Sequence, residues 1–392
     1  MKKYLVVLGL ILCTLLTLAS CKDKEATLLY HADGALFHSV SYTEGERVQS
    51  LTAVPEKEGY VFNGWYYDEG VWENPFDPAD LNYAFRAGTH KLYARFEHVS
   101  FALNADGAGY TVTGALAGLG EELVIPAKYL GKPVTAIAES AFQNNAHIRA
   151  VHIPDSVTYI GQYAFSGCRA LLEVTLPNAT GLAAGKGVFS FCTSLARVDL
   201  GATLKEISAY GFEGCTALSS VTAYGVERVL DSAFKNCTAL TQISLPDSVK
   251  RIEARAFFGC TSLIAIELSG RTEEIGENAF SGCHSLSSIV FRGESGLHTL
   301  GKGALADTAV TSLSLPSLIS LGESALPGTL ESLQFGNKSL MYVGARAFAT
   351  LKEEATVVYG STVEEFESAF KHAEWSEGRT VTIACQNGEI AP

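Results

Sequence analysis

The sequence predicts a mainly β chain, in which a solenoid of about ten stacked repeats with end caps follows a small β domain. The first observation is a unit of about 23 residues that begins near Val134 and has the form Ile160-Gly-x-x-Ala-Phe165-x-Gly-Cys168-x-x-Leu171-x-x-Val174-x-Leu176-Pro177. The second is that its phenylalanine position recurs at spacings of 21 to 25 residues. The residues at this position are Phe142, Phe165, Phe189, Phe212, Phe234, Phe257, Phe280, Leu305, Leu326 and Phe348.

The period and the L-x-x-V-x-L pattern predict how each unit folds. A period in the low twenties with this pattern is typical of leucine-rich-repeat solenoids. We expect Leu171, Val174 and Leu176 to point inward from one wall, and Phe165 from the opposite wall. A single unit cannot bury its apolar face alone, so it must stack on its neighbours. Such a chain is expected to serve as a binding scaffold or as a spacer, and we do not expect an enzyme.

Composition narrows the class of protein further. Of the 392 residues, 47% are hydrophobic and 18% are charged, which is typical of an ordered protein. The formal net charge of −13 argues against nucleic acid as a partner and against a basic patch that would hold an anionic bilayer.

The first 20 residues have the features of a processing signal. Lys2 and Lys3 precede an apolar stretch from Leu5 to Ala19, which is too short to span a bilayer comfortably. The following Leu18-Ala19-Ser20-Cys21 resembles the lipobox of bacterial lipoproteins. That resemblance implies cleavage before Cys21, a diacylglycerol on its sulfur, and residues 21–26 as a tether. The alternative is an ordinary secretory signal with a chance cysteine.

Residues 27–98 differ from the repeats and are expected to form the small β domain. Alternation in residues 60–62 and 92–96 predicts strands, and Asn63-Gly64 and Asp68-Glu69-Gly70 predict turns. Gly59-Tyr-Val-Phe-Asn-Gly-Trp-Tyr-Tyr-Asp68 resembles the Listeria–Bacteroides repeat, a small β-grasp module of bacterial surface proteins. We expect its aromatic side chains to form the core of the domain, because a module of this size needs most large side chains inside. A platform that stacks on carbohydrate is the alternative.

The ends of the solenoid are expected to carry caps, because a stack of repeats must shield its first and last units. Residues 99–133 form the predicted N-terminal cap, with hairpin strands at 101–103 and 110–112 and a strand at 122–126. Residues 134–351 hold the repeats. Residues 352–392, which include Glu364, Phe366, Trp375 and Cys385, form the predicted C-terminal cap.

From about residue 99 to the end, the pattern I-G-x-x-A-F-x-G-C-x-S-L-x-x-V-x-I-P resembles the BspA-type leucine-rich repeats of bacterial surface proteins. Leu305 and Leu326 depart from it, since both replace phenylalanine. Together with the N-terminal module, the resemblance implies a surface-exposed lipoprotein of the adhesin-like kind. Some members of that family bind host matrix components, and others have no known ligand.

Six of the nine cysteines lie three residues after the phenylalanine position. In the repeat before them the same position holds Asn145, and in the repeats after them it holds Thr308 and Thr329. All of these side chains can form a hydrogen bond with the backbone of a turn. We therefore expect a buried ladder of free thiols. Disulfides between neighbouring repeats are the alternative, whereas a linear stack does not converge on a metal ion. The six are Cys168, Cys192, Cys215, Cys237, Cys260 and Cys283.

The sequence contains none of the motifs G-x-S-x-G, H-E-x-x-H, P-loop, C-x-x-C or EF-hand loop. We therefore name no catalytic residue, no metal site and no cofactor. The histidines are scattered, and we interpret them as surface residues.

The outward side chains of the predicted repeat strands form the natural ligand surface. They are rich in hydroxyl groups and poor in the Trp, Tyr and Arg residues that dominate binding energies. Charged side chains favour the N-terminal half, where we place the contact. The candidate partner-binding residues are His152, Glu173, Thr175, Arg197, Asp199, Thr222, Gln242 and Glu267.

Two functions remain open at this stage. The first is a lipid-anchored surface protein that binds a host or bacterial surface protein through the solenoid. The second is a structural spacer or envelope component without a dedicated ligand. We expect a monomer, anchored in the membrane through the lipid on Cys21, at the cell surface or outer membrane. The side of the envelope that it faces stays open.

Overall fold

The computed structural model describes residues 24–46, 54–58, 60–70, 72, 74–76, 85–117, 119–336, 340–352, 354–370 and 381–390. The lipobox and Cys21, Gly59 of the N-terminal motif, and Trp375 and Thr380 of the predicted C-terminal cap lie outside these residues. The chain forms two compact units. One comprises residues 1–98 and 128–132, and the other comprises residues 99–127 and 133–392.

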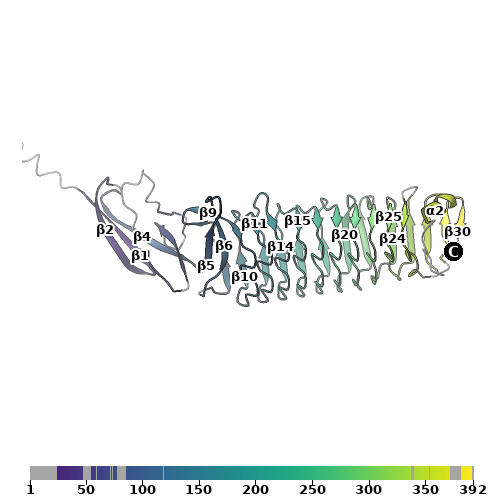
Figure 1. Ribbon diagram of the computed structural model, residues 1–392, viewed down its shortest axis with the longest axis horizontal. Helices are drawn as coiled ribbons and strands as arrows, with labels where there is room; N and C mark the ends of the chain where they lie inside the picture. The colour runs from purple at the N-terminus through teal and green to yellow at the C-terminus, as the bar shows by residue number, and fades with distance from the viewer. Residues whose placement is uncertain are drawn as a thin grey trace, which may run out of the picture. The chain divides into compact units, whose positions relative to one another are not determined.

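The N-terminal unit is built on a mixed four-stranded sheet (Figure 1). Its strand order is β2-β1-β4-β3, in which β1 and β4 pair in parallel at the centre and the outer pairs are antiparallel. One face of the sheet buries Leu28, Tyr30 and Leu92 together with Trp65, so the motif's tryptophan belongs to the core, as predicted. The strands are β1 (Glu25–Ala32), β2 (Ala35–Thr43), β3 (Val61–Tyr66) and β4 (Gly88–Glu97).

The predicted turn at Asn63-Gly64 is wrong. These residues lie inside β3, at a bulge where the pairing with β4 shifts between Phe62 and Gly64. Gly64 has a φ of 115°, which glycine adopts without a steric penalty. Asn63 is buried and its amide donates to Glu97 at 2.6 Å, so the side chain is fixed in the unit instead of facing solvent at a turn. The predicted turn at residues 68–70 is confirmed.

The solenoid unit begins with the predicted hairpin, which pairs β5 (Val99–Leu103) with β6 (Tyr110–Ala115). Each following repeat adds one three- to five-residue strand to a first parallel sheet, whose order is β22-β20-β18-β16-β14-β12-β10-β7. We call this sheet the long-strand face. Its members are β7 (Glu122–Val124), β10 (Ala150–His152), β12 (Glu173–Thr175), β14 (Arg197–Asp199), β16 (Ser220–Thr222), β18 (Gln242–Ser244), β20 (Ala265–Ser269) and β22 (Ser288–Arg292).

A second wall of mostly two-residue strands forms from the segment before each phenylalanine position, and we call it the short-strand face. It consists of the sheet β13-β11-β9-β6-β5, with β8 paired to β9, and the sheet β15-β17-β19-β21-β23-β25-β27. Its further strands are β8 (Lys128–Tyr129), β9 (Lys132–Ile137), β11 (Tyr159–Ile160), β13 (Ala183–Ala184), β15 (Glu206–Ile207), β17 (Arg228–Val229), β19 (Arg251–Ile252), β21 (Glu274–Ile275), β23 (Thr299–Leu300), β25 (Ser320–Leu321) and β27 (Tyr342–Val343).

Beyond β22 the longer strands continue in a second sheet of order β24-β26-β28-β29-β30. The interruption falls where the repeat is longest, between Phe280 and Leu305. Within the predicted cap, β28 extends the parallel pairing, and the antiparallel pair β29 and β30 follows a short helix, α2 (Figure 1). The bounds are β24 (Ser312–Leu315), β26 (Ser332–Phe335), β28 (Thr356–Tyr359), α2 (Val363–Phe370), β29 (Ile383–Cys385) and β30 (Gly388–Ile390).

The phenylalanine position forms a column in the core of the solenoid. From Phe142 to Phe280 the seven rings stack with centroid separations of 5.1 to 5.7 Å and interplanar angles of 1 to 13°. Leu305 and Leu326 then continue the buried column without rings. Because each inner ring lies between two others, the repeats share one continuous core, which confirms the predicted solenoid.

The glycines of the repeat serve two different purposes. A Cβ on Gly161 would lie 2.4 Å from the backbone nitrogen of Glu139 in the preceding repeat, so this glycine permits close backbone approach. Gly214 instead has a φ of 71° and lies under the ring of Phe191, where a Cβ would lie 2.7 Å from that ring. Both positions therefore set the distance between repeats.

Candidate functional site

The long-strand face has the register that the repeat pattern predicts. The second residue of each strand, such as Val174, Val198 or Ile266, is buried, while the residues on either side of it face outward. Strands that pair in parallel at the spacing of one repeat place equivalent residues side by side. Glu173 therefore neighbours Arg197, and Thr175 neighbours Asp199.

All eight candidate partner-binding residues lie on this face. They belong to β10, β12, β14, β16, β18 and β20, which are consecutive strands of the same sheet. Asp199 and Thr222 pair across β14 and β16, and Gln242 lies one strand further on, next to Ala265. The structure thus brings the candidates together in two rows of outward side chains.

The charged candidates in the N-terminal half already have partners within the chain. Arg197 donates to Glu173 at 2.8 Å, and the His152 Nε2 atom lies 2.9 Å from a carboxylate oxygen of Glu122. The carboxylate of Asp199 accepts a hydrogen bond from the backbone N–H of Gly201 at 2.9 Å. These side chains are exposed, so each contact contributes only about 0–1 kcal/mol, but each orients its side chain along the face.

The central part of the face is hollowed and three of its polar side chains are unpaired. A depression of about 520 Å³ extends from Ser219 to Val290 across β16, β18, β20 and β22. Ser220, Gln242 and Ser244 line it, and none of their side chains has a hydrogen-bond partner within the described part of the chain. These groups are free to bond a partner.

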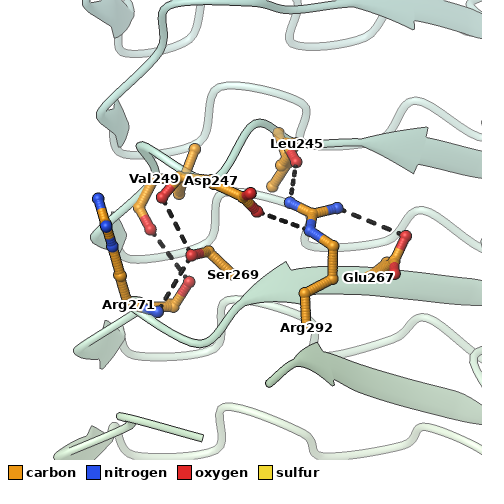
Figure 2. Close-up of polar contacts among 8 residues, drawn as sticks. Leu245, Asp247, Val249, Glu267, Ser269, Arg271 and Arg292 are labelled. Atoms are coloured by element: carbon orange, nitrogen blue, oxygen red, sulfur yellow. Dashed lines mark hydrogen bonds and ion pairs between the residues drawn. The ribbon is translucent and has the colours of Figure 1, made fainter. Parts of the chain in front are cut away.

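An arginine borders this depression and ties three repeats together (Figure 2). From β22, the guanidinium of Arg292 donates to Asp247 at 2.7 Å and to the carbonyl oxygen of Leu245 at 2.6 Å, and it lies 3.4 Å from Glu267. Ser269 donates to the carbonyl oxygen of Asp247 at 3.0 Å in the same cluster. Glu267 is therefore held at the rim of the depression by Arg292.

A second depression, of about 460 Å³, lies at the N-terminal end of the face. Three candidates line it, namely His152, Glu173 and Thr175. Asp155 and Asn178, from the turns that follow the strands, also line it. Hydrogen bonds join these turns from one repeat to the next: Asp155 accepts from the N–H of Asn178 at 2.8 Å, and Asn178 accepts from the N–H of Ala202 at 2.8 Å. Arg197 and Asp199 lie on β14, between the two depressions, and Thr222 lies on β16, the first strand of the central depression.

The six cysteines form the predicted buried ladder. Each thiol donates to the carbonyl oxygen of the phenylalanine in the preceding repeat, at sulfur–oxygen distances of 3.1 to 3.2 Å. For example, Cys237 donates to Phe212 and Cys260 donates to Phe234. All six are buried and free, and Cys385 is half-buried and free. Each of these carbonyl groups also accepts the backbone N–H three residues later in its own repeat, as Phe212 does from Cys215, so the thiol adds a second hydrogen bond from the next repeat.

Burial lowers the reactivity of five of the six ladder thiols. It raises the pKa of Cys168 and of Cys215 to about 12, and it raises the pKa of Cys192, Cys237 and Cys260 as well. Because the thiolate is the nucleophile and metal ligand, a thiol that stays protonated does neither kind of chemistry. The ladder is part of the core.

No group of three or more His, Cys, Asp or Glu residues within the described ranges is placed to hold a metal ion. Those ranges also contain no helix with the length and apolar character needed to cross a bilayer.

The sequence interpretation missed the ion pairs on the short-strand face. Lys205 lies 2.9 Å from Glu227, and Glu206 accepts from Arg228 at 2.8 Å, in each case from one repeat to the next. Opposite charges separated by 22 residues would have revealed both pairs, because that separation equals one repeat. Each exposed pair is individually weak, but together they fix the register between repeats.

The family comparison decides the class of the chain. Residues 135–263, 222–329 and 251–376 match the BspA type leucine rich repeat region, and these ranges together cover more than half of the sequence. The chain belongs to the BspA-type leucine-rich-repeat family. Residues 27–95 of this BspA-type protein match the Listeria-Bacteroides repeat domain.

Solved structures of leucine-rich-repeat proteins resemble this BspA-type chain. A protein from Bacteroides ovatus is 22% identical over 69% of this chain and 80% of its own, with a TM-score of 0.49. A leucine rich cell surface protein from Faecalibacterium prausnitzii is 21% identical over 69% of this chain and 96% of its own, with a TM-score of 0.31. The T. pallidum leucine rich repeat protein is 22% identical over 71% and 96%, with a TM-score of 0.38. A comparison with curated proteins gives no match.

Proposed function

We propose that this BspA-type protein is a lipid-anchored protein of the bacterial surface that binds a protein partner through the long-strand face of its solenoid. The observation that supports this most directly is the central depression between Ser219 and Val290, where neighbouring polar side chains have no partner within the described chain. Solenoids use continuous faces of this kind to bind extended partners.

The chemistry of the depression favours a partner with exposed backbone groups and small side chains. Its lining consists of serine, glutamine, alanine and branched apolar residues, with Glu267 as its one acidic group among the lining residues. Such a surface offers hydrogen bonds and close approach but no aromatic anchor. The negative charge of the whole chain favours a neutral or basic protein.

Because Glu173 and Arg197 form an ion pair, we place the proposed partner contact nearer the centre of the long-strand face. A partner that used either charge would first have to break or share their 2.8 Å contact. The unpaired side chains of Ser220, Gln242 and Ser244 carry no such cost. We therefore place the main contact at β16, β18 and β20, with the N-terminal candidates at its edge.

The alternative function is a structural spacer or envelope component without a dedicated ligand. The pairing of most charged side chains between repeats favours it, because a surface whose charges are already satisfied offers few attachment points. A spacer would tolerate any hydrophilic side chain on the long-strand face. A binding protein would lose affinity for its partner when the side chains at the contact are replaced.

Bulky charged side chains in the depression separate the two functions. The double variant Ser220→Arg, Ser244→Arg is expected to fold normally, because both side chains face outward, and to lower affinity for a surface-protein partner at least about 100-fold by filling the contact. The measurement is binding of the purified mature protein to fractionated host and bacterial surface proteins. A matched control places arginine on the short-strand face at Thr299 and Ser320, where we expect the parental affinity. If both variants bind the partner with equal affinity, the long-strand face is not the binding surface.

The membrane anchor is a separate part of the proposal and rests on the sequence of residues 1–21. Cys21→Ala is expected to abolish metabolic labelling with palmitate and to release the protein from the membrane fraction, because no sulfur remains to accept the diacylglycerol. Cys13→Ala, within the apolar stretch, is the matched control and is expected to label as the parent does. Labelling that persists in Cys21→Ala would rule out this anchor.

A further inference from the structure

We propose that the N-terminal unit binds the pyranose rings of an oligosaccharide in a hollow on its sheet. The hollow has a volume of about 320 Å³. Four aromatic side chains and two carboxylates line it, and all belong to the N-terminal unit. They are Tyr60, Trp72, Tyr93, Phe96, Asp33 and Glu69. This site is independent of the protein-binding face proposed above.

Three of the four aromatic side chains of the hollow lie outside the buried core, whereas Phe96 packs against it. The core of this unit consists of fully buried residues such as Leu28, Tyr30 and Leu92, whereas Tyr60, Trp72 and Tyr93 remain half-buried. An aromatic ring in that position offers an apolar face, and tyrosine and tryptophan add a polar edge. A pyranose ring has the matching form, with one face of C–H groups and a rim of hydroxyl groups.

The polar groups of the hollow favour a neutral polyhydroxylated ligand. The Lys57 Nζ atom lies 2.7 Å from a carboxylate oxygen of Asp33 and 4.5 Å from the centre of the Tyr60 ring. Glu69 is exposed and adds a second acceptor. A hydroxyl group both donates and accepts, so it can bond either partner, whereas an anion would meet two carboxylates.

The backbone is strained where it meets the hollow. Trp72, which lines the hollow, is a non-glycine residue with left-handed backbone, with a φ of 58°. Such strain concentrates at ligand sites, where the fold holds a side chain in place for binding. Asp33 also has a positive φ, of 50°, but it lies in the two-residue Asp-Gly turn between β1 and β2, where that conformation is the ordinary one. The Nε2 atom of His31, which also lines the hollow, is buried and has no hydrogen-bond partner among the described atoms. Buried polar atoms nearly always have one, so a polar ligand would complete the site.

The test is a titration of the mature protein with two tetrasaccharides, followed by calorimetry and by tryptophan emission. Chitotetraose represents bacterial cell-wall glycans, and lacto-N-tetraose represents host glycans, so the better ligand identifies the source. We expect saturable binding of at least one, with a change in emission that disappears in Trp72→Phe. Tyr93→Ala is expected to weaken binding about tenfold. The exposed Glu69→Gln is expected to weaken it about threefold without affecting folding.

Tyr224→Ala is the matched control, because this tyrosine is 60% exposed on the solenoid, and it should bind as the parent does. If Tyr93→Ala proves unfolded by circular dichroism, Glu69→Gln and Trp72→Phe decide the question. Failure of both saccharides to bind at about 10 mM would overturn the proposal, as would equal affinity in the parent, Glu69→Gln and Trp72→Phe.

Discussion

Replacing Phe234 by alanine is expected to lower the free energy of unfolding by about 3–5 kcal/mol. Phe234 is fully buried, and its ring stacks on Phe212 at 5.4 Å and on Phe257 at 5.2 Å. The substitution therefore removes contacts with two neighbouring repeats as well as its own. Because the repeats share one core, the loss should spread along the stack instead of remaining local.

Chemical denaturation of the mature protein measures this effect, and hydrogen exchange shows its spread. Phe191→Ala makes the same truncation at a side chain that is 50% exposed, so we expect a change of no more than about 1 kcal/mol there. A Phe234→Ala protein as stable as Phe191→Ala would mean that the column of rings does not carry the fold.

Stability is expected to fall steeply between pH 8 and pH 10 because of the cysteine ladder. Burial raises the pKa of Cys168, Cys192, Cys215, Cys237 and Cys260 in the folded state, whereas an unfolded thiol titrates near about 8.5. The contribution of these thiols is therefore complete below the unfolded pKa and is lost as the pH rises toward the folded pKa. Each thiol can remove up to about 1.4 kcal/mol per pH unit in this window.

Threonine provides the matched control, since Thr308 and Thr329 occupy the same position in later repeats. A threonine hydroxyl still donates to a backbone carbonyl, as Thr308 does to Leu305 at 2.9 Å, but it does not titrate. In Cys215→Thr, Cys237→Thr, the pH dependence of the unfolding free energy should fall by up to about 2.7 kcal/mol per pH unit, because two of the thiols with a raised pKa are gone. An unchanged slope would place the pH dependence elsewhere.

The repeat pattern predicted the solenoid because each of its elements has a local cause. The phenylalanine period set the stacking, and the alternation around Val174 set which side chains face outward, so the register of the long-strand face followed from the sequence. The cysteine ladder followed from the same period. Backbone pairing in parallel sheets requires equivalent residues to be neighbours, which leaves little freedom once the period is known.

Specific side-chain contacts between repeats, and one strand bulge in the N-terminal unit, were not predicted. Glu173 and Arg197 were placed correctly on the face, but their ion pair depends on the 24-residue separation of two charges. The reach of Arg292 across to Asp247, 45 residues earlier, depends on a side chain crossing an intervening strand. Asn63-Gly64 has the local composition of a turn, and only pairing of β3 with β4 makes it a bulge.

The most direct test of the proposed protein-binding face is site-specific photocrosslinking on intact cells. A benzophenone amino acid at Gln242 places the reactive group in the central depression, and the same group at Tyr342 places it on the short-strand face. Both positions are exposed, so either variant should fold. Our account predicts one discrete covalent adduct with a surface protein from position 242, which excess unmodified protein suppresses, and none from position 342. Absence of an adduct at 242, or equal adducts at both positions, would contradict it.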